Sequence, residues 1–338
     1  MIHEVIALVT VVALALVFDV TNGFHDSANA VAALVATRAA RPAQAVLLAA
    51  AFHVIGPLVA GTAVASTVGG IVRLSDQETV SVLGAAITAA LAWNLLTWWR
   101  GLPSSSSHAL VGGLVGAALV SSGVHAVRWG GFDGAHPVGV IGVIGILAIS
   151  PLLGFVAGAL GARGARRVLR RASKSIDRPI RRLEWVTAAS LALSHGANDA
   201  QKTMGVITLL LVATGHLAVF SVPLWVKLSC AGALTIGTAM GGWRIVRTIG
   251  SQIYKIRPID GLVSQAGSAA VIMSSAVLGG PVSTTHVVAS SIVGVGAAHG
   301  RRRVRWRVAG EMAAAWLVTL PAAALIAAAT LPLWRWFT

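Results

Sequence analysis

Most of this 338-residue chain consists of long apolar stretches that short polar motifs interrupt. The stretches that are nearly free of charge include Val5–Phe18, Ala43–Ile71, Val138–Leu160, Val206–Phe220 and Val308–Leu331. Several of them reach the roughly 20 residues with which a helix crosses the hydrocarbon core of a bilayer. They lack the alternation over about ten residues that is typical of membrane β-strands. The pattern therefore predicts an all-α polytopic membrane protein.

Two of the polar motifs occur twice, about half a chain apart. Gly23-Phe24-His25-Asp26 returns 173 residues later as Gly196-Ala197-Asn198-Asp199, and Pro103–His108 returns 178 residues later as Pro281–His286. Matching polar interruptions in two halves are typical of transporters whose binding site lies between inverted repeats. We therefore expect two inverted-topology repeats, whose broken or half helices meet at a substrate site near the membrane midplane.

The composition agrees with a membrane protein and limits what the basic charge can mean. Hydrophobic residues make up 56% of the chain and charged residues 11%, against about 25% charged residues in soluble domains. The net charge is +15, and the basic residues are densest in two runs, Arg163–Arg182 and Arg301–Arg307. Both runs lie between apolar spans, where cytoplasmic loops collect Lys and Arg, so we expect no nucleic-acid partner.

The basic runs also predict how the chain is oriented. Five crossings in the first half bring the chain to the face opposite its start, so the second half begins from the other side. We expect a first transmembrane repeat over residues 1–162, a basic cytoplasmic linker over 163–182 and a second, inverted transmembrane repeat over 183–338. Both termini would then lie outside a plasma (bacterial inner) membrane, with the positive charge inside.

Two aspartates within the repeated motifs are candidate sites of cation or proton coupling. Asp26 and Asp199 lie in apolar sequence, where ionisable residues are costly and usually functional. Nearby side-chain carbonyls come from Asn22, Asn29 and Asn198. Backbone breaks at Gly23 and Gly196 would add main-chain carbonyls, which gives hard oxygen ligands for a small cation or a proton relay. The alternative is that these groups only form helix–helix hydrogen bonds.

The second motif pair has the features of a helix N-terminus that binds an anion. A proline and a Ser/Thr cluster precede the apolar runs Ala109–Val120 and Val287–Gly296, as at the start of a helix. Free N–H groups and the helix dipole attract anions there. The candidate hydroxyl donors to a tetrahedral oxyanion are Ser105, Ser106, Ser283 and Thr284. Ordinary capping is the alternative for either motif taken alone.

The two kinds of motif together predict a symporter. An anion at these helix ends would lie near Asp26 and Asp199, and like charges repel strongly where the dielectric constant is low. Protonated carboxylates or co-bound cations would relieve this repulsion. We expect no enzyme, because a Ser-His-Asp hydrolase needs no symmetric duplicate of its residues. An anion channel is less favoured, since a buried carboxylate pair would impede free anion flow.

On these motifs the chain resembles the inorganic phosphate transporter (PiT) family along nearly its whole length. The resemblance rests on four segments in the same order: Asn22–Ala30, Ser104–His108, Ser194–Lys202 and Val282–His286. It implies an inverted-repeat helical transporter, often a homodimer, that takes up inorganic phosphate with sodium or protons and needs no cofactor. In the family the phosphate lies between the paired Ser/Thr half-helices. Carried over, the implied phosphate-binding residues are Ser105, Ser106, Ser283, Thr284, Asp26 and Asp199.

Two departures from the family's sodium-coupled pattern bear on the coupling ion. That pattern resembles Gly-Ala-Asn-Asp-Val-Ala-Asn-Ala in both halves, whereas His25 replaces the first Asn in one half and Lys202 replaces the later Asn in the other. A lysine ammonium can take the place of a sodium ion beside Asp199, and a histidine, whose pKa is ordinarily near 6.5, can carry a proton. We therefore predict proton coupling, as in the bacterial low-affinity carriers that this chain resembles and that can take metal–phosphate complexes. Sodium coupling and sulfate as the substrate are the alternatives.

The remaining polar residues divide by their context. His108 and His286 follow the Ser/Thr clusters, and His195 adjoins the second aspartate motif, so each is expected to relay protons or to make a structural hydrogen bond. His53 has no repeated polar context and is expected to be a packing or interfacial residue. Asp19 precedes the first motif by a turn or two and is a candidate for pairing with a local donor.

Overall fold

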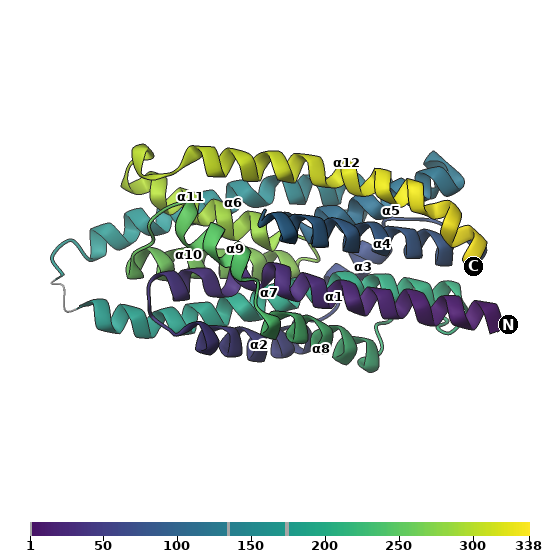
Figure 1. Ribbon diagram of the computed structural model, residues 1–338, viewed down its shortest axis with the longest axis horizontal. Coiled ribbons are helices and arrows are strands. Elements are labelled where there is room, and N and C mark those ends of the chain that lie inside the picture. Colours follow the sequence, from purple (N-terminus) through teal and green to yellow (C-terminus); the bar gives the residue numbers. More distant parts are fainter. Residues whose placement is uncertain (1, 134–135, 173–175) are drawn as a thin grey trace.

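Helices that run roughly along one long axis make up almost the whole protein (Figure 1). The computed structural model describes residues 2–133, 136–172 and 176–338. The helices of the first half are α1 (Ile2–Ala36), α2 (Pro42–Val59), α3 (Ala63–Gly69), α4 (Asp76–Arg100), α5 (Ser106–Ser122) and α6 (Gly139–Val168). Those of the second half are α7 (Asp177–Ala213), α8 (Leu224–Met240), α9 (Trp243–Arg247), the π-helical turn η3 (Thr248–Gln252), α10 (Pro258–Val277), α11 (Thr284–His299) and α12 (Trp306–Phe337). The short elements are the 3-10 helices η1 (Val124–Ala126) and η4 (Arg301–Arg303) and the paired strands β1 (Phe132–Asp133) and β2 (His136–Pro137).

Five of the described helices are long and apolar enough to cross a membrane: α1, α2, α4, α6 and α12. A sixth span is formed if α8 and the α9–η3 segment, which meet at a bend of 63°, cross together. The all-α polytopic fold predicted from the sequence is therefore confirmed. The apolar stretch Ala43–Ile71 forms two helices instead of one, because the chain turns at Gly61, where φ is +76°.

Helices of the first half pack against helices of the second half in matching pairs. α1 packs against α8 and α7 packs against α2, while α5 packs against α12 and α11 packs against α6. The N-terminus lies at one end of the bundle and α7 starts at the other, so α1 and α7 run in opposite directions (Figure 1). Both helices that carry the aspartate motifs therefore lie against the opposite half of the chain, and the polar residues of the motifs are buried.

The predicted backbone breaks at Gly23 and Gly196 are wrong. α1 and α7 continue as helices through both glycines. The physical reason for glycine here is close helix packing. A Cβ atom at Gly23 would lie 2.2 Å from the backbone oxygen of Leu234 in α8, and one at Gly196 would lie 2.9 Å from the Cα of His53 in α2. The glycines let two helix backbones approach each other and do not open either helix.

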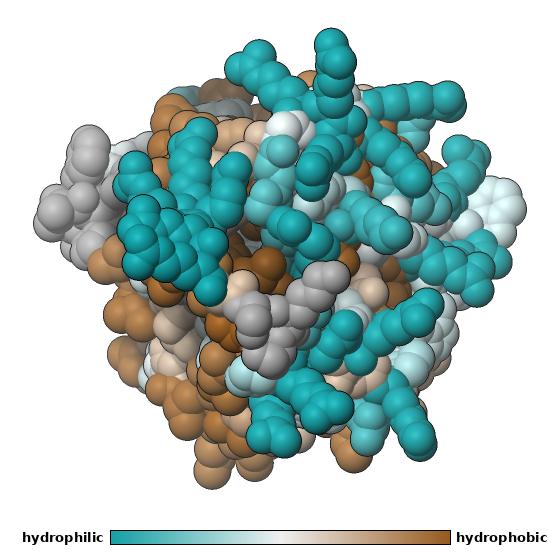
Figure 2. Space-filling view, turned by 90° about the vertical axis from the view of Figure 1, so that its left-hand side faces the viewer, coloured by the Kyte–Doolittle hydropathy of each residue, from teal (hydrophilic) through white to brown (hydrophobic). Residues whose placement is uncertain are grey.

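Hydrophilic side chains gather at the end of the bundle opposite the two chain termini (Figure 1, Figure 2). The predicted linker over 163–182 is largely helical, because residues 163–168 extend α6 and residues 177–182 begin α7. At the other end, the Arg335 guanidinium donates to the backbone oxygen of Ser121. The long basic segment and the chain termini are thus separated by the length of the bundle.

A methyl group at Gly23 should destabilise the fold, whereas one at Gly232 should not. Gly23→Ala would force the backbones of α1 and α8 apart, and overpacking of this kind typically costs about 1–3 kcal/mol. Gly232 lies on α8 with no atom within 4 Å of an added Cβ, so Gly232→Ala is the matched control. Thermal unfolding of the purified protein in detergent measures the difference. Equal melting temperatures for the two variants would contradict the packing described.

Candidate functional site

Each half ends a long helix, turns, and begins a half-length helix with the same local chemistry. Gly101 lies just beyond α4 with φ of +66°, and Gly279 lies just beyond α10 with φ of +74°, a backbone conformation that glycine adopts readily. The side chains of Ser105 and Ser283 then cap α5 and α11, where each accepts the backbone N–H three residues later, at 3.2 and 3.3 Å. The helix starts expected from the repeated motif are therefore present in both halves.

The N-termini of α5 and α11 meet inside the bundle. Ser107 Oγ donates to the backbone oxygen of Val282 at 3.0 Å, and the rings of His108 and His286 lie 4.8 Å apart between their centroids. The predicted anion donors at these ends are all buried: Ser105, Ser106, Ser283 and Thr284. The structure thus brings four hydroxyl groups to two adjoining helix ends, where backbone N–H groups lack partners within their own helices.

Asp199 on α7 is buried and has a cation at its side. Lys202 Nζ lies 2.5 Å from Asp199 Oδ1 and also donates to the backbone oxygen of Val282 at 3.2 Å. A carboxylate and a main-chain carbonyl are ligands that a sodium ion would take, so the ammonium occupies a position suited to a cation. The other carboxylate oxygen accepts from Thr284 at 3.3 Å and from Asn22 at 3.4 Å.

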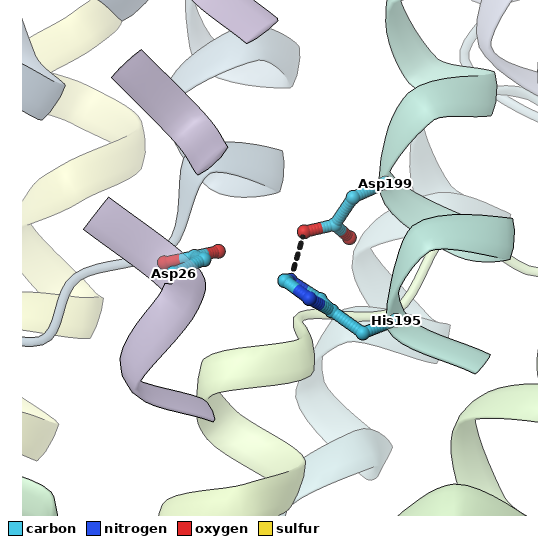
Figure 3. A group of neighbouring side chains, drawn as sticks. All are labelled: Asp26, His195 and Asp199. Atoms are coloured by element: carbon cyan, nitrogen blue, oxygen red, sulfur yellow. Dashed lines mark ion pairs between the residues drawn. The ribbon is translucent and has the colours of Figure 1, made fainter. Parts of the chain in front are cut away.

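Asp26 on α1 lies close to Asp199 on α7 (Figure 3). His25 Nδ1 is 2.7 Å from Asp26 Oδ1, and Thr285 Oγ1 donates to the same oxygen at 3.1 Å. Ligand atoms of Asp26, His195 and Asp199 all lie within 4.8 Å of one another. The structure therefore brings the two predicted aspartates together beside the N-terminus of α11.

A chain of buried histidines leads away from Asp199. His195 Nε2 lies 2.8 Å from Asp199 Oδ2, close enough for an ion pair, although it makes no hydrogen bond there. His195 Nδ1 is 2.8 Å from His53 Nε2, and His53 Nδ1 is 2.7 Å from Thr238 Oγ1. His53 was expected to be a packing or interfacial residue, but it belongs to this polar chain. It has no counterpart in the other half, so the repeat could not reveal it.

A second chain leads away from Asp26. His25 Nε2 is 3.2 Å from Thr97 Oγ1, and Thr97 Oγ1 is 2.8 Å from Ser104 Oγ. Thr97 lies outside the residues that the sequence singled out, whereas Thr285 lies within the repeated Ser/Thr motif but was not named as a site residue. Ser104 belongs to the repeated Ser/Thr motif, so this chain joins the first aspartate motif to the segment that precedes α5.

The two halves place their histidine differently along the helix. The first half has Asn22, His25 and Asp26, and the second half has His195, Asn198 and Asp199 at the same spacing. One Asn and one His have thus changed places between the repeats. Each aspartate still has one histidine beside it, since His25 pairs with Asp26 and His195 with Asp199.

The three predicted asparagines donate hydrogen bonds but leave their oxygens without donors. The amide nitrogen of Asn198, for example, donates to the backbone oxygen of Gly280 at 3.1 Å. The buried amide oxygens of Asn22, Asn29 and Asn198 have no hydrogen-bond partner in the part of the chain that the structure describes. Buried polar atoms without partners are rare in proteins. These oxygens are therefore positioned to receive a cation or a hydrogen-bond donor.

Asp26, His195 and Asp199 are close enough to hold a metal ion. However, Asp199 Oδ1 is already paired with the Lys202 ammonium. A fixed divalent ion would lie near the ammonium, and like charges disfavour that arrangement. The donor set therefore gives no support for a resident metal ion.

Comparison with known proteins identifies the family. The family described as the phosphate transporter family matches residues 22–327. The chain belongs to this family. It is 44% identical over 322 residues to a probable low-affinity inorganic phosphate transporter of Rhizobium meliloti, which covers 95% of this chain and 94% of the relative. It is 41% identical over 323 residues to a Bacillus subtilis protein of the same description, which covers 95% of both chains.

A solved structure described as the sodium-dependent phosphate transporter has the same fold as this chain. The TM-score is 0.84 over 97% of this chain and 98% of the other, at 22% sequence identity. The resemblance to the PiT family is confirmed by the family match and the relatives. Because that family consists of transporters, the prediction of a transporter that is not an enzyme is also confirmed. The apolar helices of this chain make it a multi-pass membrane protein.

Asp19 joins α1 to α7 near the site. Its side chain is buried, and Thr203 Oγ1 donates to Asp19 Oδ1 at 2.5 Å. Asp19 Oδ2 has no hydrogen-bond partner among the described residues. The partner of Asp19 is therefore not the expected local donor but a residue of the other half of the chain.

Loss of the Thr203 hydroxyl should weaken the contact between α1 and α7. Thr203→Val removes a hydroxyl donor from a buried carboxyl group, which typically costs about 1–3 kcal/mol. Thr208 lies on the same helix with a buried hydroxyl that has no partner in the described part of the chain. Thr208→Val is therefore the matched control, with unchanged or higher stability. Unfolding curves that coincide for the two variants would argue against a structural role of the Asp19–Thr203 hydrogen bond.

Proposed function

We propose that this member of the phosphate transporter family is a proton-coupled symporter that carries inorganic phosphate into the cell. The substrate follows from the descriptions of the relatives from Rhizobium meliloti and Bacillus subtilis. The observation that supports proton coupling is the position of the Lys202 ammonium. It lies 2.5 Å from Asp199 and donates to a main-chain carbonyl, so it makes the contacts that a bound sodium ion would make.

In this proposal, phosphate binds between the N-termini of α5 and α11. Its hydrogen-bond donors are backbone N–H groups and the hydroxyls of Ser105, Ser106, Ser283 and Thr284. A phosphate that carries a proton also donates, and the carboxylates of Asp26 and Asp199 can accept that hydrogen bond, whereas sulfate at neutral pH has no hydrogen to donate. Phosphate is therefore favoured over sulfate as substrate. Equal competition by sulfate in an uptake assay would contradict this assignment.

Charge balance supports protons as the coupling ions. Two carboxylates beside a phosphate require compensating positive charge. Lys202 compensates Asp199, but Asp26 has only His25 at 2.7 Å as a chargeable partner in the described contacts. A proton on the Asp26–His25 pair supplies the missing charge, and His195 can take a further proton beside Asp199. We assign Asn22, Asn29 and Asn198 to the same coupling region as acceptors.

We place the basic end of the bundle in the cytoplasm and both chain termini outside the plasma membrane, as the distribution of Lys and Arg favours. The exchanged packing partners and the opposite directions of α1 and α7 support two inverted repeats. The homodimer and the transport of metal–phosphate complexes stay predictions from the family resemblance.

Phosphate uptake into proteoliposomes, with proton and sodium gradients imposed separately, tests the proposed function. We expect an inward proton gradient alone to drive saturable accumulation. Asp26→Asn should abolish it, because an amide cannot take up the coupling proton. Accumulation that needs sodium would contradict proton coupling, and flux that does not saturate would indicate an anion channel.

Lys202→Asn should make transport depend on another cation. The change places Asn where the first half has Asn29 and leaves Asp199 without its ammonium. We expect sodium-free uptake to fall by about tenfold or more, which corresponds to about 1.4 kcal/mol, and added sodium to restore part of it. Lys227→Asn, at the other lysine within an apolar helix, is the control. Unchanged sodium-independent uptake by Lys202→Asn would refute the role given to this lysine.

A further inference from the structure

Two pockets flank the site in matching positions of the two halves. One, of about 380 Å³, lies against residues 99–103 at the end of α4 and is bounded by α9, η3 and α12. The other, of about 520 Å³, lies against the end of α10 and residues 278–280, and is bounded by α3 and α6. The wall of each pocket includes the turn that leads into a half-length helix, α5 or α11.

The turns beside the two pockets are held in the same way. Thr248 in η3 donates to the backbone oxygen of Gly101 at 3.2 Å, and Thr67 in α3 donates to the backbone oxygen of Gly279 at 2.8 Å. Gly101 and Gly279 are the two left-handed glycines that end α4 and α10. The pockets are therefore structural counterparts. Their side chains differ although the backbone around them is held in the same way.

The two pockets differ in charge. The first is lined by Arg100, Arg244 and Arg247 and by one acidic residue, Glu311. The carboxylate of Glu311 is 2.9 Å from Arg307 Nε, so an arginine outside the lining already compensates it. The side chains described as lining the second pocket are all uncharged. Only the first pocket therefore attracts anions.

Two of the three guanidinium groups are held in place by the end of α4. Arg244 Nη1 donates to the backbone oxygen of Trp99 at 2.6 Å, and the guanidinium carbon lies 5.5 Å from the centre of the Trp98 ring. The Arg100 guanidinium lies 5.4 Å from the centre of the Trp99 ring. A guanidinium group has five N–H donors, so each retains donors for a ligand while its position is restrained.

We propose that the pocket lined by Arg100, Arg244 and Arg247, here called the arginine pocket, binds a phosphate group. The identity of the anion rests on the proposed function. Guanidinium groups bind phosphate oxygens through paired, charge-assisted hydrogen bonds. Pro103 in the pocket wall is two residues from the Ser105 cap of α5, so the arginine pocket lies beside the start of the helix at which phosphate is proposed to bind. The matching pocket in the other half has an uncharged lining and provides no comparable anion site.

Equilibrium binding of radiolabelled inorganic phosphate to the protein in phosphatidylcholine nanodiscs tests the arginine pocket. We expect two classes of site in the wild type. Arg244→Gln/Arg247→Gln should lose one class or weaken it by about tenfold or more. The control, Arg301→Gln/Arg302→Gln, removes the same charge from the basic end outside the pocket and should bind as the wild type does. Arg244 also donates to a backbone oxygen at the end of α4, so its loss could prevent folding. In that case Arg247→Gln alone is the variant to test.

Identical binding by the wild type and a folded pocket variant would overturn the proposal. A second set of nanodiscs with phosphatidylglycerol distinguishes the source of the phosphate group. Arginine-dependent binding that persists there assigns the pocket to free phosphate, and its loss assigns the pocket to a lipid headgroup, so both results support a phosphate-group site. Failure of the proposed function is distinguishable, because the wild type would then show no gradient-driven uptake while arginine-dependent binding persisted.

Discussion

Lys202 and Asp199 form an ion pair inside a helical bundle, at the place where Asp26 and two helix N-termini also meet. A charge removed from water is strongly unfavourable unless it is paired and hydrogen-bonded, so each group here constrains its neighbours. The ammonium offsets one carboxylate without a bound ion. The second carboxylate has His25 beside it, 2.7 Å away, and is the group to which the proposed mechanism assigns the coupling proton. In the proposed mechanism, Lys202 supplies a fixed positive charge and the Asp26–His25 pair supplies one that changes with transport.

The packing of the helices makes this arrangement possible. Gly23 and Gly196 let α1 and α7 approach α8 and α2 closely, and the polar residues of the two aspartate motifs are buried. The halves repeat the turns, the caps and the exchange of partners. They differ where charge matters: one Asn and one His change places, Lys202 replaces an Asn, and only one of two matching pockets contains arginines. A symmetric framework thus carries an asymmetric distribution of charge.

Much of this could be predicted from the sequence, because the membrane restricts the chain to helices and duplication marks the unusual residues twice. The capped starts of α5 and α11 and the proximity of Asp26 to Asp199 follow from that repetition. Gly23 and Gly196 were predicted wrongly, since a glycine that opens a helix and one that lets two helices touch look alike in sequence. His53 was missed because its role depends on contact with His195, 142 residues away, and has no repeated counterpart.

The most direct measurement is a calorimetric titration of the purified protein with phosphate in sodium-free buffers that differ in ionisation enthalpy. Comparison of the heats gives the number of protons taken up for each phosphate bound. If Lys202 replaces a coupling cation and protons supply the remaining charge, phosphate binds without sodium and the protein takes up protons as it binds. Binding that appears only when sodium is added, or that involves no proton uptake, would contradict the account.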